Sequence, residues 1–315
     1  METILNLFTN CLWIKPHIEV EGVTYKLIRH LTEGGFSSID LVENTRTGKV
    51  FVVKRITCHS IEDQNLARNE IEINRKFKNH PNIIPVIGAT VTGTADIVHN
   101  ITSEVVIVFP YFKLGSLHDE LERRRLAESP LSEPTVLQLF LSLCQAVREL
   151  HHSNPPIAHR DLKPHNVLLD SDLKPILMDF GSCAPAQVTV TNLREAQYLQ
   201  DTAAERSSMC YRPPELFQVS SVCQIDERTD IWSLGCLLYA IMFYSSPFDI
   251  IYERGDSVAL AVQSAKIVFP QGSPYSDDLH QLVTEMTNVD INFRANIDSV
   301  IEKVEAIINT TNTTC

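Results

Sequence analysis

The sequence lacks several features that would each define a class of protein. Its 8 cysteines include no C-x-x-C pair, which argues against a zinc ribbon or a thioredoxin-type redox site. Its longest mainly apolar run, residues 231–243, has 13 residues, whereas a membrane-spanning helix needs about 20. We therefore expect a buried core helix there. A net charge of −12 argues against a general nucleic-acid-binding surface, which needs clustered lysine and arginine.

The N-terminus also lacks a basic leader, since Met1 is followed by Glu2, and we expect no secretory signal. Cys144 and Cys236 lie among apolar residues and are interpreted as small buried side chains, so a reducing, cytoplasmic compartment is favoured. Residues 1–21 form an N-terminal extension whose apolar residues have helix-like spacing. Two interpretations stay open for it: packing against the domain, or contact with a membrane surface.

The 315 residues suffice for one two-lobed domain or two ordinary ones. A hydrophobic content of 44% is enough to bury a sizeable core. No linker or internal repeat divides residues 25–308, and the last residues, 309–315, are interpreted as a polar, frayed tail. We therefore expect one continuous folded unit rather than a string of modules.

The chemistry is concentrated in residues 159–166, which read His-Arg-Asp-Leu-Lys-Pro-His-Asn. Asp161 is suited to orient an incoming hydroxyl and accept its proton, and Lys163 to offset charge that develops on a transferred phosphoryl group. Asn166 offers an amide oxygen to a metal ion, and a second carboxylate follows at Asp179 in Leu-Met-Asp-Phe-Gly. The set predicts phosphoryl transfer.

The two stretches resemble the H-R-D-x-x-x-x-N and D-F-G elements of protein kinases. The resemblance implies an α+β, two-lobed fold with a small antiparallel-sheet lobe that carries one helix and a larger, mainly helical lobe. We place the kinase domain at 22–308, with the N-lobe at 22–109, the hinge at 110–115 and the C-lobe at 116–308. It implies ATP and Mg²⁺ as cofactors, Asp161 and Lys163 as catalytic residues, and Asn166 and Asp179 as metal ligands.

Expected strands at 25–31 and 39–42 flank a short glycine turn. Such a turn lets backbone N–H groups approach phosphates closely. Of the three kinase glycine positions only the middle one, Gly34, is glycine here, so the motif alone is equally typical of a plain hairpin. The resemblance assigns the turn and its flanks to nucleotide binding: Leu31, Thr32, Glu33, Gly34, Gly35, Phe36, Ser37, Ser38 and Ile39.

Lys54 ends the apolar run Phe51-Val52-Val53, and two interpretations apply to it. A strand lysine usually extends from a sheet edge to solvent. The resemblance to the V-A-I-K motif implies instead that Lys54 holds the α- and β-phosphates, with Val52 at the adenine. Glu70, in an expected helix at 62–78, is the acid that the kinase pattern pairs with Lys54, although Glu62 and Glu72 compete for the role.

The kinase pattern also makes predictions about the helix around Glu70 and about the hinge. The residue one turn after the paired glutamate is normally apolar, and here it is Asn74. Strands are expected at 86–91 and 104–111, and the hinge that follows implies that adenine bonds the Pro110 carbonyl and the Phe112 amide. An alternative for the hinge is an ordinary strand-to-helix link.

Residues 179–215 correspond to the activation segment of kinases, and their middle, residues 195–206, is rich in strong helix formers. Arg160 is the usual partner for a phosphate on this segment. Glu215, in the stretch equivalent to A-P-E, is expected to pair with Arg294, and Asp230 to cap a buried helix and bond the catalytic-loop backbone. Candidate phosphorylation sites are Thr189, Thr191, Thr202, Ser207 and Ser208.

Further stretches, including residues 33–37, 40–43, 226–230 and 255–263, resemble the Numb-associated kinase family. That resemblance implies an extra helix in the activation segment, a role in membrane trafficking and a perinuclear or Golgi-membrane location. Glu2 rules out N-myristoylation on this sequence, whereas Cys11 is a candidate for palmitoylation. One acyl chain gives weak, peripheral anchoring.

The leading hypothesis is a serine/threonine protein kinase with protein substrates and no nucleic-acid partner. Lys163 favours Ser/Thr over Tyr, because tyrosine kinases usually lack that lysine. One alternative is a pseudokinase scaffold, supported by the reduced glycine turn and by Asn74. Another is a small-molecule phosphotransferase of kinase-like fold, which would lack the Glu215 and Arg294 platform. The sequence does not determine the oligomeric state.

Overall fold

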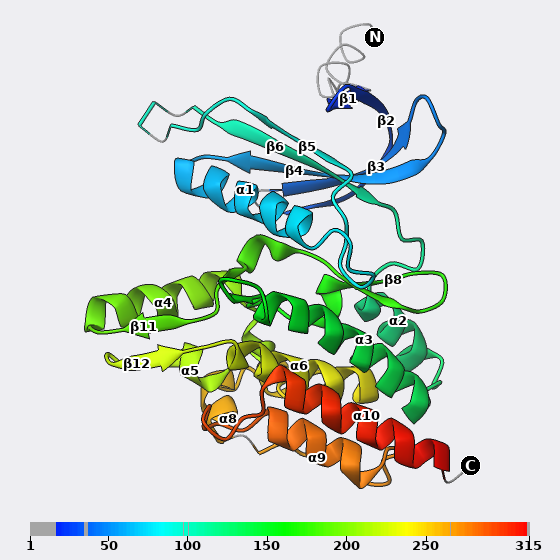
Figure 1. The fold of residues 1–315 in the computed structure, drawn as a ribbon, viewed down its shortest axis with the longest axis vertical. Coiled ribbons are helices and arrows are strands. Elements are labelled where there is room, and N and C mark those ends of the chain that lie inside the picture. The colour runs from blue at the N-terminus through cyan, green and yellow to red at the C-terminus, as the bar shows by residue number, and fades with distance from the viewer. Residues whose placement is uncertain (1–16, 35–36, 97, 100, 265, 314–315) are drawn as a thin grey trace, which may run out of the picture. The chain divides into compact units, whose positions relative to one another are not determined.

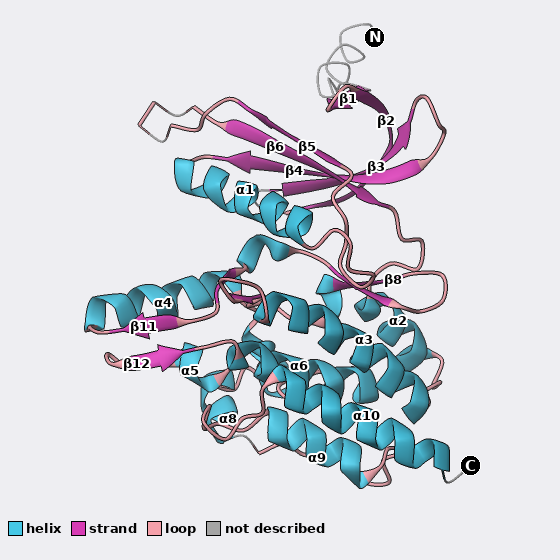
Figure 2. Ribbon diagram, viewed as in Figure 1, coloured by secondary structure: helices cyan, strands magenta, loops and turns pink. Residues whose placement is uncertain are grey.

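The computed structural model describes residues 17–34, 37–96, 98–99, 101–264 and 266–313. The chain divides into two compact units, one formed by residues 1–78 and 85–111 and the other by residues 79–84 and 112–315. The first contains a sheet and one helix, and the second is mainly helical (Figures 1 and 2). This confirms the predicted α+β class. Residues 1–16, with the predicted apolar pattern and Cys11, lie outside the described part of the chain.

The first unit contains a six-stranded antiparallel sheet of order β1-β2-β3-β4-β6-β5. Its elements are β1 (His17–Val20), β2 (Val23–Glu33), β3 (Ser37–Asn44), β4 (Val50–Cys58), α1 (Ile61–Lys76), β5 (Gly88–Thr92) and β6 (Ser103–Pro110). Strand β4, which carries Lys54, lies between β3 and β6 and is therefore not an edge strand.

Strand β1 corrects the expected extent of the N-terminal extension. Ile18 and Val20 are buried while His17 and Glu19 are exposed, the alternation of a half-buried strand. The chain then reverses at Glu21 and Gly22, which both have positive φ, and β1 pairs with β2. Residues 17–20 are therefore part of the folded sheet, because two apolar side chains at period two complete its core with Tyr25, Val42 and Val53.

Helix α1 begins with a reciprocal cap. The Asp63 amide donates to Ser60 Oγ at 3.0 Å, and the Ser60 amide donates to Asp63 Oδ2 at 2.9 Å. Such a box satisfies two of the backbone donors that a helix start leaves without partners. It fixes where α1 starts, and thus which residues of α1 turn toward the sheet.

The second unit is built around α3 and α6. Its helices are α2 (Leu117–Leu126), α3 (Glu133–His151), α4 (Leu193–Arg206), α5 (Pro214–Phe217), α6 (Arg228–Phe243), α7 (Asp249–Glu253), α8 (Val258–Ser264), α9 (Asp277–Met286) and α10 (Ile297–Thr313). Its strands pair as β7 (Ile157–Ala158) with β10 (Ala184–Pro185), β8 (Val167–Leu169) with β9 (Pro175–Leu177), and β11 (Val188–Val190) with β12 (Cys223–Ile225).

The core helices have the faces that the sequence predicts. Val136, Phe140 and Leu143 of α3 are fully buried, as the spacing of four and three requires. Helix α6 contains the apolar run 231–243 and is buried on every side. Gly235 allows α9 to approach α6, because a Cβ there would lie 2.9 Å from Met286 Cβ. No helix in the described ranges combines the length and the apolarity that crossing a membrane requires.

Two predictions about helix ends are wrong. Helix α10 continues to Thr313 rather than ending before a frayed tail, and the Thr310 hydroxyl donates to the Ile307 carbonyl at 2.9 Å within it. Asp230 does not cap α6, since the N-cap position is Glu227 and has no side-chain cap bond. Asp230 lies one turn further in, where its carboxylate is available for other contacts.

Candidate active site

Asp161 is held by three donors within the second unit. Its Oδ2 atom lies 2.8 Å from Lys163 Nζ and accepts a hydrogen bond from Asn166 Nδ2 at 2.9 Å. Its Oδ1 atom accepts the Ser208 amide at 2.9 Å. The residue is buried with 8% of its surface exposed, and such a carboxylate keeps its orientation without a substrate. This is the arrangement that a proton acceptor for an incoming hydroxyl needs.

Lys163 connects the catalytic loop to the end of the activation segment. Besides Asp161, its Nζ atom contacts Ser208 Oγ at 2.7 Å. The sequence indicated Ser208 only as a phosphorylation candidate, so its positioning role was missed. The available signal was a hydroxyl residue shortly before Pro213-Pro214-Glu215. The lysine thus places a positive charge between a carboxylate and a hydroxyl side chain.

The two predicted metal ligands, Asn166 and Asp179, are joined through the backbone. Asn166 Nδ2 donates to the Asp161 carbonyl oxygen at 2.8 Å and also to the Asp161 carboxylate. The Asn166 Oδ1 acceptor takes no part in these two bonds. The Met178 amide donates to the Asn166 carbonyl at 2.9 Å, and the following residue, Asp179, has φ of 62°. A left-handed conformation at a non-glycine residue is uncommon and indicates a constrained functional position.

This donor set fits magnesium. One amide oxygen and one carboxylate give few protein ligands, and Mg²⁺ usually completes its shell with phosphate oxygens and water. In the described ranges, no group of three or more His, Cys, Asp and Glu side chains forms a metal cluster. Two protein ligands are few for a permanent structural ion, so Asn166 and Asp179, as predicted ligands, would hold an ion that is bound to phosphate.

Asp230 fixes the backbone of the catalytic loop, as predicted. Its Oδ2 accepts the His159 amide at 2.7 Å and its Oδ1 accepts the Arg160 amide at 2.9 Å, while His151 Nε2 lies 3.0 Å from Oδ2. Burial acts to raise the pKa of Asp230, but the His151 hydrogen bond, the charges of His151 and His159 and the Arg160 amide outweigh it and lower that pKa. The charged carboxylate is therefore the stable form in this buried position.

The predicted pairing of Glu215 and Arg294 is also confirmed. Arg294 Nη1 and Nη2 contact Glu215 Oε1 and Oε2 at 2.7 and 3.0 Å, a bidentate geometry. Arg294 Nε also donates to the Asn288 carbonyl at 2.9 Å. The pair anchors the end of the activation segment to the helical core.

In the first unit, Lys54 forms the predicted ion pair with Glu70. Lys54 Nζ lies 2.8 and 3.0 Å from the two Glu70 carboxylate oxygens. Because β4 is a central strand, Lys54 does not extend from a sheet edge. Glu62 and Glu72 are exposed whereas Glu70 is 2% exposed, so the competing acids are excluded.

Asn74, the unusual residue one turn after Glu70, is fully buried. Its Nδ2 donates to the Glu70 carbonyl at 2.8 Å, so the side chain bonds back onto its own helix. Its Oδ1 has no hydrogen-bond partner among the described residues. A buried amide oxygen of this kind costs about 1–3 kcal/mol unless water or another group reaches it.

The predicted nucleotide turn lies between β2 and β3. Thr32 pairs with Ile39 and Glu33 with Ser38, and the Gly34 amide donates to the Ser37 carbonyl at 2.7 Å. Leu31 lies on the same strand, and Gly35 and Phe36 lie outside the described residues. The phosphate-binding role of the turn stays a prediction.

The predicted adenine contacts also stay predictions. Val52 is half-buried on β4 and pairs with Leu41 and Phe109. Pro110 is the last residue of β6, and the Phe112 carbonyl accepts the Gly115 amide at 3.2 Å, which leaves the Phe112 amide outside that turn bond.

The activation segment contains the predicted helix and a strand that the sequence did not indicate. Helix α4 spans Leu193–Arg206, and its cap is Asn192, whose Oδ1 accepts the Glu195 amide at 3.0 Å. Strand β11 pairs with β12 just before it. Arg160 Nη2 donates to the carbonyls of Pro185 and Ala186, at 3.4 and 3.3 Å. Arg160 Nη2 therefore bonds backbone carbonyls, whereas Arg160 was expected to contact a phosphate.

A fixed carboxylate beside a lysine, with an amide and a second carboxylate nearby, defines a phosphotransferase of the kinase type. The protein kinase domain model matches residues 25–304. Serine/threonine-protein kinase 16 of Homo sapiens is 40% identical over 94% of this chain and 94% of that protein. Serine/threonine-protein kinase ppk13 of Schizosaccharomyces pombe is 32% identical over 97% of this chain and 95% of that protein. The chain belongs to the protein kinase family.

Proposed function

We propose that this protein is a serine/threonine protein kinase that transfers the γ-phosphoryl group of ATP to hydroxyls of protein substrates. The observation that carries the proposal is the pairing of Lys163 with both Asp161 Oδ2 and Ser208 Oγ. It joins the proton acceptor to the segment that precedes the Glu215 platform. The names of the relatives given above support the same activity.

Each charged residue has a definite task in this proposal. Magnesium-bound ATP supplies the phosphoryl group when it is bound. Asp161 orients the substrate hydroxyl and accepts its proton, and Lys163 stabilises charge that develops during transfer. Asn166 and Asp179 hold the metal ion, and Lys54, positioned by Glu70, holds phosphate oxygens.

The alternative of an inactive scaffold is disfavoured, because every charged group that the chemistry needs is present, and the observed contacts position Asp161, Lys163 and Lys54. A peptide panel tests the choice of acceptor. Matched peptides with Ser, Thr or Tyr at one position are incubated with ATP, with and without EDTA. We expect magnesium-dependent transfer to Ser and Thr. Transfer to Tyr alone, or transfer that EDTA does not affect, would contradict the proposal.

We further propose that the kinase is active without a phosphate on its activation segment. Helix α4, the β11–β12 pair and the Arg160 contacts to Pro185 and Ala186 support this, since they order the segment with protein groups alone. Phosphatase treatment of the purified protein should then reduce peptide phosphorylation by less than about twofold, because no contact to a phosphate is lost. If such a contact did order the segment, each 1.4 kcal/mol of it would cost about tenfold. A loss of tenfold or more would show that phosphorylation orders the segment.

The resemblance to the Numb-associated kinase family supports a proposal for location. The protein attaches peripherally to perinuclear or Golgi membranes through an acylated Cys11 and acts in membrane trafficking. The test is cell fractionation of the wild type and of Cys11→Ser. The membrane fraction should fall in the variant, and equal fractions would exclude this anchor.

A further inference from the structure

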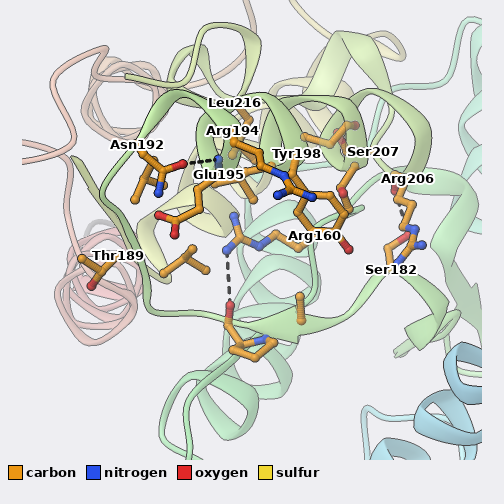
Figure 3. A pocket seen from close by; sticks show the side chains of 17 residues that line it. Arg160, Ser182, Thr189, Asn192, Arg194, Glu195, Tyr198, Arg206, Ser207 and Leu216 are labelled. Carbon is orange, nitrogen blue, oxygen red and sulfur yellow. Dashed lines mark hydrogen bonds between the residues drawn. The ribbon is translucent and has the colours of Figure 1, made fainter. Parts of the chain in front are cut away.

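The last turn of α4 is held by side chains from both ends of the activation segment. A helix end leaves carbonyl groups without partners inside the helix. Arg212 Nη2 donates to the Ala204 carbonyl at 3.3 Å, and the Ser182 hydroxyl donates to the Arg206 carbonyl at 2.7 Å. Figure 3 shows Ser182 beside Arg206. The activation segment therefore encloses the C-terminal end of its own helix.

Arg212 also holds the residue that follows α4. Its Nε donates to Ser207 Oγ at 2.8 Å, and its Nη2 donates to the Ser207 carbonyl at 2.8 Å. The guanidinium lies over the Phe217 ring, 4.9 Å from the ring centroid, and Arg212 is only 6% exposed. A cation at a helix C-terminus is favourably placed against the partial negative charge of the carbonyls. Arg212 is therefore fixed on one face by Phe217 and at its edge by Ser207.

One peptide unit connects Arg212 to the proposed proton acceptor. The carbonyl oxygen of this unit belongs to Ser207 and accepts from Arg212 Nη2, while its N–H belongs to Ser208 and donates to Asp161 Oδ1 at 2.9 Å. Because a trans peptide unit is planar, the direction of its carbonyl sets the direction of its N–H. Arg212 therefore sets the line along which Asp161 receives this hydrogen bond.

The other oxygen of Asp161 depends on the same residue, Ser208. Lys163 Nζ lies 2.7 Å from Ser208 Oγ and 2.8 Å from Asp161 Oδ2. Burial lowers the pKa of Arg212, whereas the charge of Asp161 acts to raise it, so these two charges interact as well. A displacement of Ser208 would thus disturb the contacts of both Asp161 oxygens.

We propose that Arg212 and Ser182 are positioning residues for phosphoryl transfer, an assignment that rests on the kinase activity proposed above. They hold the end of α4 so that the peptide unit between Ser207 and Ser208 keeps the Asp161 carboxylate in place. Neither residue touches the substrate hydroxyl or the phosphate, and each acts through Ser208. A purely structural role predicts instead that their loss lowers stability and leaves turnover of the folded protein unchanged.

Steady-state kinetics of the full chain with a Ser/Thr peptide test the role of Arg212. Arg212→Met keeps an unbranched side chain but removes its donors, and kcat should fall about tenfold or more because misplaced catalytic groups are costly. KM for ATP should stay within about twofold, the pattern for an interaction that acts only in the transition state. Arg212→Lys restores the charge and a donor, and its kcat should be at least about threefold above that of Arg212→Met.

Arg124→Met is the matched control for Arg212→Met. Arg124 Nη1 also donates to a backbone carbonyl near a helix end, that of Ser129 beyond α2, but it has no described contact with the catalytic loop. The control should keep the wild-type kcat. Circular dichroism at the assay temperature establishes that each variant is folded.

Ser182→Ala is a smaller change at the same helix end. It removes one hydrogen bond, and kcat should fall about threefold. Its control is Ser264→Ala, because the exposed Ser264 hydroxyl also donates to a helix carbonyl at 2.7 Å, that of Ala261, and this variant should be unchanged. If Arg212→Met does not fold, Ser182→Ala decides. Wild-type kcat in the folded variants at positions 212 and 182 would overturn the proposal, and so would a higher KM for ATP with unchanged kcat.

Hydrogen–deuterium exchange separates this inference from the proposed activity, because it needs no turnover. Amides of residues 203–211 should exchange at least about fivefold faster in Arg212→Met and Ser182→Ala than in the wild type, and at the wild-type rate in both controls. Unchanged exchange in both variants would overturn the hold on α4. Faster exchange with wild-type kcat would overturn the positioning role and leave the kinase activity standing. Faster exchange in the variants of a wild type that transfers no phosphate would contradict the activity and leave the hold intact.

Discussion

The catalytic loop of the second unit and the glycine turn of the first unit are both predicted to handle phosphate, but they are built differently. In the loop, side chains hold side chains: Asp161 has three donors, and Asp230 holds two loop amides and a histidine. In the described part of the turn, backbone pairs with backbone: the Gly34 amide donates to the Ser37 carbonyl, and Glu33 pairs with Ser38.

The difference shows where each region carries its specificity. A loop that depends on charged side chains requires particular residues, because removing one leaves buried partners unsatisfied. A turn that offers backbone N–H groups requires only a conformation, and many residues adopt it. This explains how two of the three kinase glycine positions can be Thr32 and Ser37 while every charged residue of the loop is kept.

The largest expected effect is on turnover in Asp179→Ala. The variant removes the carboxylate that we assign to the metal ion, and magnesium-dependent peptide phosphorylation should fall by about 10³-fold, as for other losses of transition-state charge stabilisation. The measurement is kcat at saturating ATP and peptide. Asp172→Ala, an exposed aspartate in the same unit, is the control and should keep wild-type activity. Normal activity in Asp179→Ala would remove this residue from the metal site.

The second effect is on stability, in Asp230→Ala. The change leaves the His159 and Arg160 amides and the His151 side chain without their acceptor in a buried site, and the free energy of unfolding should fall by about 3 kcal/mol. Urea denaturation measures it.

Asp298→Ala is a matched control for Asp230→Ala. Asp298 also contacts a histidine and an arginine, but it lies at the surface with 42% of its side chain exposed. Surface ion pairs contribute about 0–1 kcal/mol, so the loss there should be smaller. Equal losses in the two variants would show that burial does not set the value of the loop contacts.

A third effect concerns pH and the histidine next to Asn166. The rings of His165 and His118 stack with centroids 3.8 Å apart. Burial, followed by the charges of His118 and Lys163, lowers the pKa of His165 below 6.5. The unfolded chain then binds more protons than the folded chain below about pH 6.5, so stability should fall as the pH is lowered from there through the folded pKa. At pH 8 this contribution is complete.

The test compares thermal melting of the wild type and His165→Gln at pH 8 and pH 5.5. The wild type should lose more stability between the two values than the variant does, because the variant lacks the titrating ring. The same decrease in both proteins would exclude His165 as a source of the pH dependence.

The smallest effect is expected in the turn. In Gly34→Ala, the new Cβ would lie 3.6 Å from the Ser37 carbonyl oxygen, an ordinary contact, and Gly34 is not among the glycines with positive φ. The melting temperature should therefore stay within a few degrees, which corresponds to less than about 1 kcal/mol. KM for ATP should rise only a few-fold. A loss of stability as large as that of Asp230→Ala would abolish the contrast between the turn and the loop.

The sequence predicted the charged constellation because its spacing reports directly on chemistry. Lys54 and Glu70, Asp161 and Lys163, and Glu215 and Arg294 are pairs whose members the structure brings into contact. Helix α4 was also predictable, since its residues are intrinsically strong helix formers. Local propensity and side-chain charge can both be recognised without knowledge of the fold.

Long-range pairing could not be recognised in the same way. Strand β11 has three residues and exists because β12, more than thirty residues later, pairs with it. Ser208 meets Lys163 across 45 residues of sequence, and a serine alone does not predict that contact. The wrong assignment of Asp230 as a cap has a similar cause, because an aspartate near a helix start is a usual cap and only the tertiary fold supplies its other partners.

The most direct test of phosphoryl transfer at Asp161 is mass spectrometry of the purified protein after incubation with magnesium and ATP, with Asp161→Asn treated identically and a Ser/Thr peptide added to both. We predict new phosphate on Ser or Thr of the peptide, or of the protein itself, in the wild-type sample alone. Equal phosphate in the Asp161→Asn sample, or none in either at matched protein and ATP concentrations, would contradict the account.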